Sequence, residues 1–240
     1  MTTAATSDRI TFVRHHEPDG WIESVAREMA DILEHGIRQT GRARMLLSGG
    51  TTPAPVYQAL AELPVQWDRV EVGLVDERWL SPQDRDSNAW LVRDSFLQRA
   101  EGAHFDPLVR VGKPLSECVH SANLHARHSQ APCLAVLGMG SDGHTASLFP
   151  GARDLHVALE SPQPYAALDA TGCPVANDWH LRITLTPHGL APIGARLLLL
   201  RGQQKLDVLD AALQSTDVSR YPVLAAIAAP GPKLRVHWCA

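Results

Sequence analysis

The sequence has few cysteines, few aromatic residues and no long hydrophobic run. Its four cysteines are widely spaced, at Cys118, Cys133, Cys173 and Cys239, and form neither a CxxC motif nor the Cys/His pattern of a zinc site. No segment approaches the roughly 18 uninterrupted apolar residues of a membrane-spanning helix, and the N-terminus lacks the basic start and apolar run of a signal peptide. We therefore expect a cytoplasmic protein with reduced thiols and no membrane partner.

An excess of positive charge is also lacking. The chain has 22 Lys and Arg against 26 Asp and Glu, a formal net charge of −4. Without a net positive field, nucleic acid is not an expected partner, and any anionic ligand must be held by local groups. The twelve histidines include His15, His16, His120, His125 and His128, but no helical HExxH pattern. We expect scattered surface histidines and no metal site.

The length of 240 residues allows one large α/β domain or two small ones. A chain of this size buries roughly 70–75% of its unfolded surface, so its core needs neither disulfide nor metal. The sequence contains no low-complexity segment and no repeat of fixed period. A single domain over residues 1–240 is the simpler prediction. The sequence does not determine the oligomeric state, and a monomer is the default expectation.

Short apolar runs alternate with helical patterns along most of the chain. Apolar residues recur at helical spacing over 21–35, opposite a charged face, and a second helical pattern spans 205–213. Strands that are apolar throughout and alternate with helices are typical of a parallel sheet covered on both faces. The sequence therefore predicts an α/β fold with a mainly parallel, Rossmann-like sheet, whose expected strands are 43–47, 70–75, 134–137 and 197–200.

Each expected strand is followed by a distinctive polar cluster. In open α/β sheets the ligand lies beyond the carboxyl ends of the strands, so these clusters should converge on one crevice. After the first strand, two glycines let the backbone approach an anion, and three hydroxyls add donors. The candidate ligand-binding residues here are Ser48, Gly49, Gly50, Thr51 and Thr52. The alternative is a tight strand-to-helix turn capped by Thr51 or Thr52.

Two further clusters carry the side chains of acid-base and anion chemistry. The turn 138–143 matches GxGxxG, but its continuation does not suit a dinucleotide site, and His144 follows it. An imidazole placed after such a turn can act as a general acid or base, the alternative being a capping or solvated histidine. After another strand come Asp76, Glu77 and Arg78, where Arg78 could clamp an oxyanion. The alternative there is a buried structural ion pair.

Several segments together resemble the 6-phosphogluconolactonase family, in the family's order. They are LSGGTTP (47–53), DERWLSPQDRDSN (76–88), LGMGSDGHTASLFPG (137–151), RITLT (182–186) and RGQQK (201–205), and the resemblance covers most of residues 20–215. It implies a three-layer sandwich shared with sugar-phosphate isomerases, glucosamine-6-phosphate deaminase and CoA transferases.

The implied reaction is hydrolysis of 6-phospho-D-glucono-1,5-lactone to 6-phospho-D-gluconate, the second step of the oxidative pentose phosphate pathway, without a cofactor. The small-molecule partner is thus a sugar-phosphate lactone. The resemblance makes His144 the base that deprotonates water, with Asp142 to orient or tune it. It places Arg78 and Lys205 on the substrate's anionic groups, and Arg182 among the substrate-binding residues.

Two other functions fit the same fold. An amino-sugar-phosphate deaminase or isomerase should show a tyrosine after Asp76-Glu77 and a run like IAFNEPG after the histidine, whereas this chain has Arg78 and TASLFPG. A non-catalytic sugar-phosphate sensor should keep the phosphate groups and lose the base, but His144 is present. The lactonase is therefore favoured.

The sequence departs from the family pattern in three places. Thr51 stands where family members often have serine, a change that keeps the hydroxyl. The segment 187–192 reads Pro-His-Gly-Leu-Ala-Pro, where the family usually has an apolar run that contains an asparagine, so we do not carry over the substrate contacts of that run. In the tail, which we assign no catalytic role, residues 234–238 alternate in polarity like an edge strand.

Overall fold

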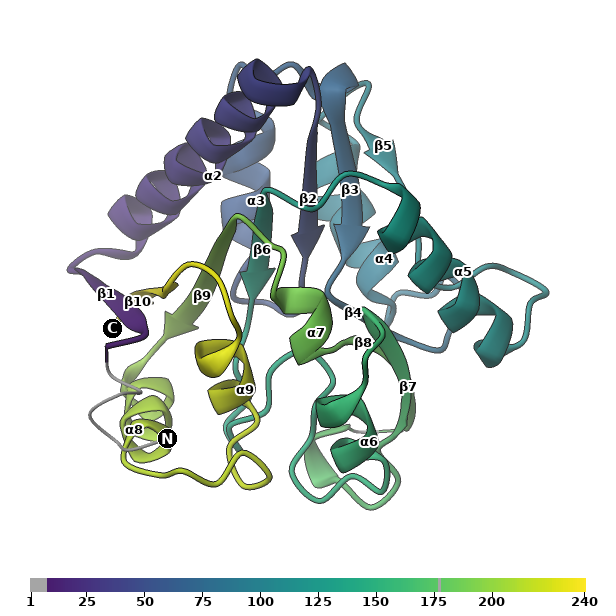
Figure 1. Ribbon diagram of the computed structural model, residues 1–240. Coiled ribbons are helices and arrows are strands. Elements are labelled where there is room, and N and C mark those ends of the chain that lie inside the picture. The colour runs from purple at the N-terminus through teal and green to yellow at the C-terminus, as the bar shows by residue number, and fades with distance from the viewer. Residues whose placement is uncertain (1–7, 177) are drawn as a thin grey trace.

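The computed structural model describes residues 8–176 and 178–240, and its centre is a seven-stranded parallel sheet (Figure 1). All of its strand pairs are parallel. The strand order is β1 (Ile10–His15), β10 (Leu234–Cys239), β9 (Ala195–Arg201), β6 (Leu134–Leu137), β2 (Ala43–Leu47), β3 (Val70–Leu74) and β5 (His104–Phe105). The α/β class and the mainly parallel sheet are confirmed.

Helices cover both faces of this sheet. In Figure 1, α3 (Ala54–Ala61) and α4 (Asn88–Val92) lie behind it, whereas α5 (Leu115–His128) and α7 (Pro187–Leu190) lie in front. The long helix α2 (Pro18–Thr40) packs on α3 and β2. The remaining helices are α6 (Leu155–Glu160), α8 (Gln203–Leu213) and α9 (Val223–Ala228). The arrangement is the expected three-layer sandwich.

A second, antiparallel sheet stands at the carboxyl end of the first, in the order β4 (Asp76–Arg78), β8 (Leu181–Leu185) and β7 (Tyr165–Asp169). The chain enters it directly from β3. Val75, between the two strands, donates its N–H to Leu47 O at 2.9 Å and accepts from Leu185 N at 2.8 Å. These bonds fix the small sheet below the ends of the central strands, which is where the candidate site lies (Figure 1).

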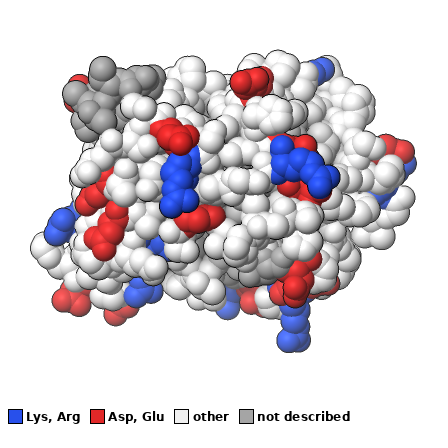
Figure 2. All heavy atoms as spheres, turned by 90° about the horizontal axis from the view of Figure 1, so that it is seen from below, with Lys and Arg blue, Asp and Glu red and all other residues white. Residues whose placement is uncertain are grey.

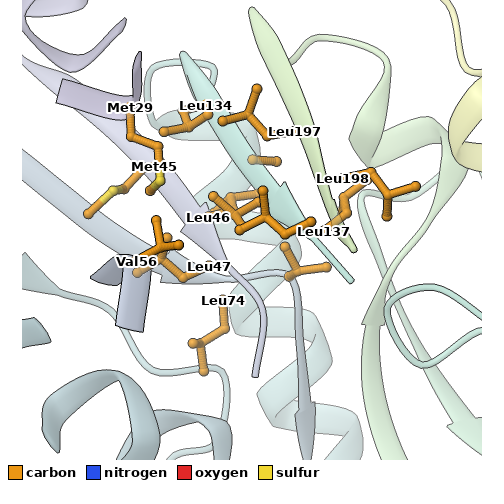
Figure 3. Packing of buried hydrophobic residues seen from close by; sticks show 14 of the residues in the cluster. Met29, Met45, Leu46, Leu47, Val56, Leu74, Leu134, Leu137, Leu197 and Leu198 are labelled. Carbon is orange, nitrogen blue, oxygen red and sulfur yellow. The ribbon is translucent and has the colours of Figure 1, made fainter. Parts of the chain in front are cut away.

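The core forms because the central strands are apolar on both faces. Leu46, Leu47, Leu134 and Leu197 are at most 2% exposed, and Met29 of α2 packs onto this cluster (Figure 3). Burying a side chain of this size contributes about 1.5–3 kcal/mol. The core is therefore stabilised without a disulfide, and all four cysteines are free thiols.

The expectation of an edge strand at 234–238 is wrong. β10 lies between β1 and β9, because β1, which was not predicted, pairs with it in parallel. The alternating polar residues contact Glu28 of α2: Arg235, whose side chain is 43% exposed, forms an ion pair with Glu28, and Nε2 of the buried His237 lies 3.2 Å from its carboxylate. Polar alternation here reflects contacts with a charged residue of α2, not a sheet edge.

Candidate active site

A cavity of about 310 Å³ lies at the carboxyl end of the large sheet, between the turns after β2 and β6, the start of α8 and the small sheet. Figure 2 looks at this end of the molecule and shows basic side chains on either side of a largely uncharged central surface. The volume suits a ligand the size of a sugar phosphate. The predicted site residues that line it are Ser48, Gly49, Gly50, Thr51, Thr52, Arg78, His144, Arg182 and Lys205.

Asp142, the remaining predicted residue, lies behind His144. Asp142 Oδ1 is 2.6 Å from His144 Nδ1 and also accepts the backbone N–H of His144 at 3.1 Å. Burial opposes ionisation of Asp142, but the hydrogen bond and charge of His144 outweigh it and lower the pKa of Asp142. A carboxylate on Nδ1 favours the tautomer with the proton on that nitrogen, which leaves Nε2 as the basic atom.

Gly140 makes room for this pair, and Gly143 makes room for Tyr221 beside it. A Cβ on Gly140 would lie 2.1 Å from His144 Nδ1 and 2.5 Å from Asp142 Oδ1, so any larger residue would displace them. Gly143 has φ +85° and its Cβ would lie 2.7 Å from Tyr221 Cδ1. Within the GxGxxG match it is therefore Gly140 that lets the imidazole contact the aspartate.

The residues after His144 hold the turn in place. Thr145 Oγ1 donates to Gly138 O at 2.8 Å, and Ser147 Oγ donates to Asp76 Oδ2 at 2.5 Å. Between them Ala146 has φ 51°, a left-handed conformation that is costly for a residue with a side chain. The ring of Phe149 lies 4.5 Å from that of His144, centroid to centroid. Packing and hydrogen bonds thus fix the imidazole before any ligand binds.

Arg78 and Arg182 stand directly opposite each other across the β4–β8 ladder. Like charges in that position are destabilising. Arg182 is 4% exposed, and burial lowers its pKa, with Asp76 acting in the opposite direction and Arg78 adding to the lowering. An anion between the two guanidinium groups would relieve the repulsion.

Backbone carbonyls fix both guanidinium groups. Arg182 donates from Nε to Trp179 O and from Nη2 to Ala176 O, each at 2.8 Å. Arg78 donates from Nη1 to Asp86 O at 2.5 Å. Because the acceptors are uncharged carbonyl groups, the positive charge of both guanidinium groups is available to a ligand in the cavity.

Lys205 brings a third cation from the first turn of α8. Its Nζ donates to Met139 O at 2.8 Å, in the turn that precedes His144. Burial lowers the pKa of Lys205, and Asp142 acts in the opposite direction. Arg201, at the end of β9, also lines the cavity. Lys205 and Arg201 lie on α8 and β9, whereas Arg78 and Arg182 lie on β4 and β8. The cavity therefore has two separate groups of cations and can hold more than one anionic group.

The turn Ser48–Thr52 carries unused hydrogen-bonding capacity. Ser48 Oγ is buried and has no partner among the described residues, although Ser48 O accepts from Tyr57 Oη at 2.9 Å. Gly50 has φ +100°, which favours glycine. Neither threonine caps α3, whose N-cap is Pro53 without a side-chain bond, so the capping alternative for this turn is wrong.

Glu77 does not form the buried ion pair considered above. Its carboxylate accepts the backbone N–H groups of Arg78, Asn88 and Ala89 at 2.7–2.8 Å. Burial raises the pKa of Glu77 to about 7, although these three N–H groups act in the opposite direction. Glu77 therefore ties β4 to the start of α4 and is absent from the cavity wall.

Residue-by-residue sequence reasoning missed Asn88 and Phe149, which also line the cavity together with Asp76 of the predicted strand-end cluster. Asn88 is 3% exposed and donates from Nδ2 to Asp76 O at 2.8 Å. A Cβ on Gly49 would lie 1.9 Å from Asn88 Oδ1, so Asn88 packs directly on the glycine turn. The signal was available, because Asn88 ends the DERWLSPQDRDSN segment and Phe149 lies within the histidine segment.

Other expected features are not at this cavity. The segment 187–192 is absent from its wall and lines a separate cavity described below. Within residues 8–176 and 178–240, no three His, Cys, Asp or Glu side chains converge as metal ligands. His125 is not simply a surface residue, since its Nε2 lies 2.7 Å from Glu71 Oε1. In the same ranges no helix is long and apolar enough to cross a membrane.

Comparison with solved structures supports the fold over nearly the whole chain. A 6-phosphogluconolactonase from Shewanella baltica is 32% identical, superposes with a TM-score of 0.88, and the match covers 96% of this chain and 98% of that one. A monomeric glucosamine-6-phosphate deaminase is 18% identical with a TM-score of 0.78, and the match covers 95% and 97% of the two chains. At that identity it shows the shared fold alone.

Sequence comparisons give the family. A protein named 6-phosphogluconolactonase from Xylella fastidiosa (strain Temecula1) is 60% identical over 231 residues, which cover 96% of this chain and 97% of that protein. One of the same name from Pseudomonas aeruginosa is 38% identical, with coverage of 89% and 88%. The family model described as glucosamine-6-phosphate isomerases/6-phosphogluconolactonase matches residues 16–238. The chain therefore belongs to the glucosamine-6-phosphate isomerase/6-phosphogluconolactonase family.

Proposed function

We propose that this chain is a carboxylic ester hydrolase that opens 6-phospho-D-glucono-1,5-lactone to 6-phospho-D-gluconate in the pentose phosphate pathway. Its near full-length similarity to proteins named 6-phosphogluconolactonase supports the reaction. The observation that carries the chemistry is the 2.6 Å contact of Asp142 with His144 Nδ1 beside a cavity with several cations. A lactone needs an activated water, a positive environment for the developing oxyanion and a proton for the departing ring oxygen.

In this proposal His144 acts twice. Its Nε2 takes a proton from water as the water oxygen attacks C1, and the imidazolium that results is stabilised by Asp142. When the tetrahedral intermediate collapses, the C1–ring oxygen bond breaks and the same proton passes from Nε2 to the departing oxygen. The carboxyl group formed then ionises. His144 is returned to its starting form without a metal or redox cofactor.

The cations have two tasks in this scheme, the binding of phosphate and the stabilisation of charge at C1. Lys205 is our candidate for the phosphate, with the donors of Ser48–Thr52 beside it. Arg78 is our candidate for the oxyanion and for the product carboxylate, and Arg182, fixed opposite it, adds positive field. Separate cation groups suit a product that carries an anion at each end.

The deaminase alternative predicts a different product, so one pair of assays separates the two. Purified protein is incubated with 6-phosphogluconolactone and, separately, with glucosamine-6-phosphate. We expect acid release from the lactone well above its spontaneous hydrolysis and no ammonia from the amino sugar. Ammonia release, or lactone hydrolysis at the background rate, would contradict the proposal.

A further inference from the structure

A second cavity, of about 530 Å³, opens beside the amino ends of β2 and β6, away from the catalytic cavity. Residues of α5, of α7 and of the chain between α5 and β6 line it. In Figure 1 both helices lie in front of the sheet. Its innermost residues are Leu46, Tyr165 and Leu185, each 2–3% exposed. Alanines and prolines form most of its rim. The cavity is thus recessed and largely apolar.

The segment in which this chain departs from the family pattern builds one wall of the cavity. His188, Gly189, Ala191 and Pro192 all line it. Thr186 caps α7 by accepting from Gly189 N at 3.1 Å. A Cβ on Gly189 would lie 2.5 Å from Pro164 O and 2.7 Å from Leu185 Cδ1, so only glycine lets the helix approach so closely. The unusual composition of 187–192 is therefore matched to this wall.

The charge of the lining has one sign. Arg44 and Arg127 contribute to it, no Asp or Glu does, and His188 adds an imidazole. Arg127 and His188 are exposed at the rim, whereas Arg44 is 5% exposed. A buried guanidinium group has five N–H donors that need acceptors.

Arg44 has only part of this requirement met. Its Nε lies 2.7 Å from Glu71 Oε1, but the N–H is not directed at that oxygen, so the contact is an ion pair without a well-formed hydrogen bond. Neither Nη atom has a hydrogen-bond acceptor among the residues that the structure describes. Arg44 thus presents two Nη groups that are not fully enclosed and have no protein acceptor among the described residues, at an apolar cavity, which is an incomplete site for an anion.

We propose that this second cavity binds a small organic carboxylate with an apolar body. The carboxylate lies against Arg44, whose planar fork matches it, and the apolar body lies on Leu46, Tyr165 and Leu185. A neutral apolar ligand would leave the Arg44 donors buried and unmet, and a sugar phosphate would place its hydroxyl groups against apolar walls. The site is separate from the proposed reaction, so the failure of either proposal leaves the other standing.

The test uses phenylacetate and its neutral analogue phenylacetamide as probes, titrated into the full-length protein by calorimetry. Phenylacetate should bind saturably. Phenylacetamide should bind at least about tenfold more weakly, because its neutral amide cannot form a charge-assisted hydrogen bond with Arg44. Arg44→Lys should weaken phenylacetate binding by about tenfold or more, since lysine lacks the fork. The matched control is Arg99→Lys, at an exposed arginine outside the cavity.

A second variant keeps the test valid if Arg44→Lys perturbs folding. Ala131 is exposed at the rim, and Ala131→Trp should block the cavity and abolish phenylacetate binding. Ala211→Trp, at an exposed alanine on α8, should not. Absence of saturable binding, equal affinity for the amide, or unchanged affinity in Ala131→Trp would each overturn the proposal. So would loss of binding in Lys205→Ala, because the ligand would then lie in the catalytic cavity.

Discussion

The substitution Gly140→Ala tests the steric basis of the histidine–aspartate pair. The added methyl would lie 2.1 Å from His144 Nδ1, 2.2 Å from His144 Cε1 and 2.5 Å from Asp142 Oδ1, whereas ordinary contacts begin near 3.4 Å. The imidazole must therefore move by roughly 1 Å or more, which lengthens the Nδ1–Oδ1 contact beyond a hydrogen bond. A misplacement of this size typically costs about 10²-fold in rate, and complete loss of the base about 10²–10⁴-fold.

The assay compares kcat for lactone hydrolysis, corrected for the spontaneous reaction, with the affinity for 6-phosphogluconate. We expect kcat of Gly140→Ala to fall by about 10²-fold or more, with affinity little changed, because the cations lie on other elements. Gly138→Ala is the matched control, since its methyl meets no atom within 4 Å and should leave kcat nearly unchanged. A Gly140→Ala enzyme with kcat within about threefold of the wild type would refute the reasoning.

Three further predictions address the phosphate, the pH dependence of stability and metals. Lys205→Ala should raise KM and weaken 6-phosphogluconate binding by ~1.5–3 kcal/mol while hardly affecting unphosphorylated gluconolactone, and equal losses on the two lactones would show that Lys205 does not bind the phosphate. Because the pKa of Glu77 is about 7 in the folded chain and lower when unfolded, the folded state holds a proton that the unfolded state has lost, and stability should decline as pH rises from about 4.5 to 7. Urea unfolding at several pH values should show that the free energy of unfolding of the wild type falls by about 2 kcal/mol more than that of Glu77→Gln over this range. An equal pH dependence in the two proteins would contradict a buried Glu77 with a raised pKa. Exhaustive EDTA treatment should leave activity unchanged, because the scheme activates water with His144, and loss of activity restored by a divalent ion would contradict that scheme.

The sequence predicted the central strands almost to the residue, because each is a continuous apolar run ended by a turn. The expected strands 43–47 and 134–137 match β2 and β6, 70–75 differs from β3 by one residue, and 197–200 lies within the longer β9, Ala195–Arg201. The helix expected at 21–35 is longer, Pro18–Thr40, because its polar first and last turns carry no apolar periodicity. β1 was missed, and β10 was placed at an edge, because the two strands pair with each other from opposite ends of the sequence, a long-range contact that no local pattern reveals.

The sequence predicted those site residues that lie in a turn directly after a central strand. Convergence of the parallel strands explains why residues as far apart as Ser48 and Lys205 share one cavity. Asn88 could not be placed in the same way, because its position depends on how α4 packs against the glycine turn. The use of 187–192 in a separate cavity also depends on tertiary packing, here of Gly189 on Pro164.

The central claim is that His144, oriented by Asp142, activates the water that opens the lactone. The most direct measurement is kcat of His144→Asn on 6-phosphogluconolactone, above the spontaneous rate, together with the affinity of the same preparation for 6-phosphogluconate. We predict that kcat falls by about 10²–10⁴-fold while product binding largely survives. A variant that binds 6-phosphogluconate normally and turns over at a near-normal rate would contradict the claim.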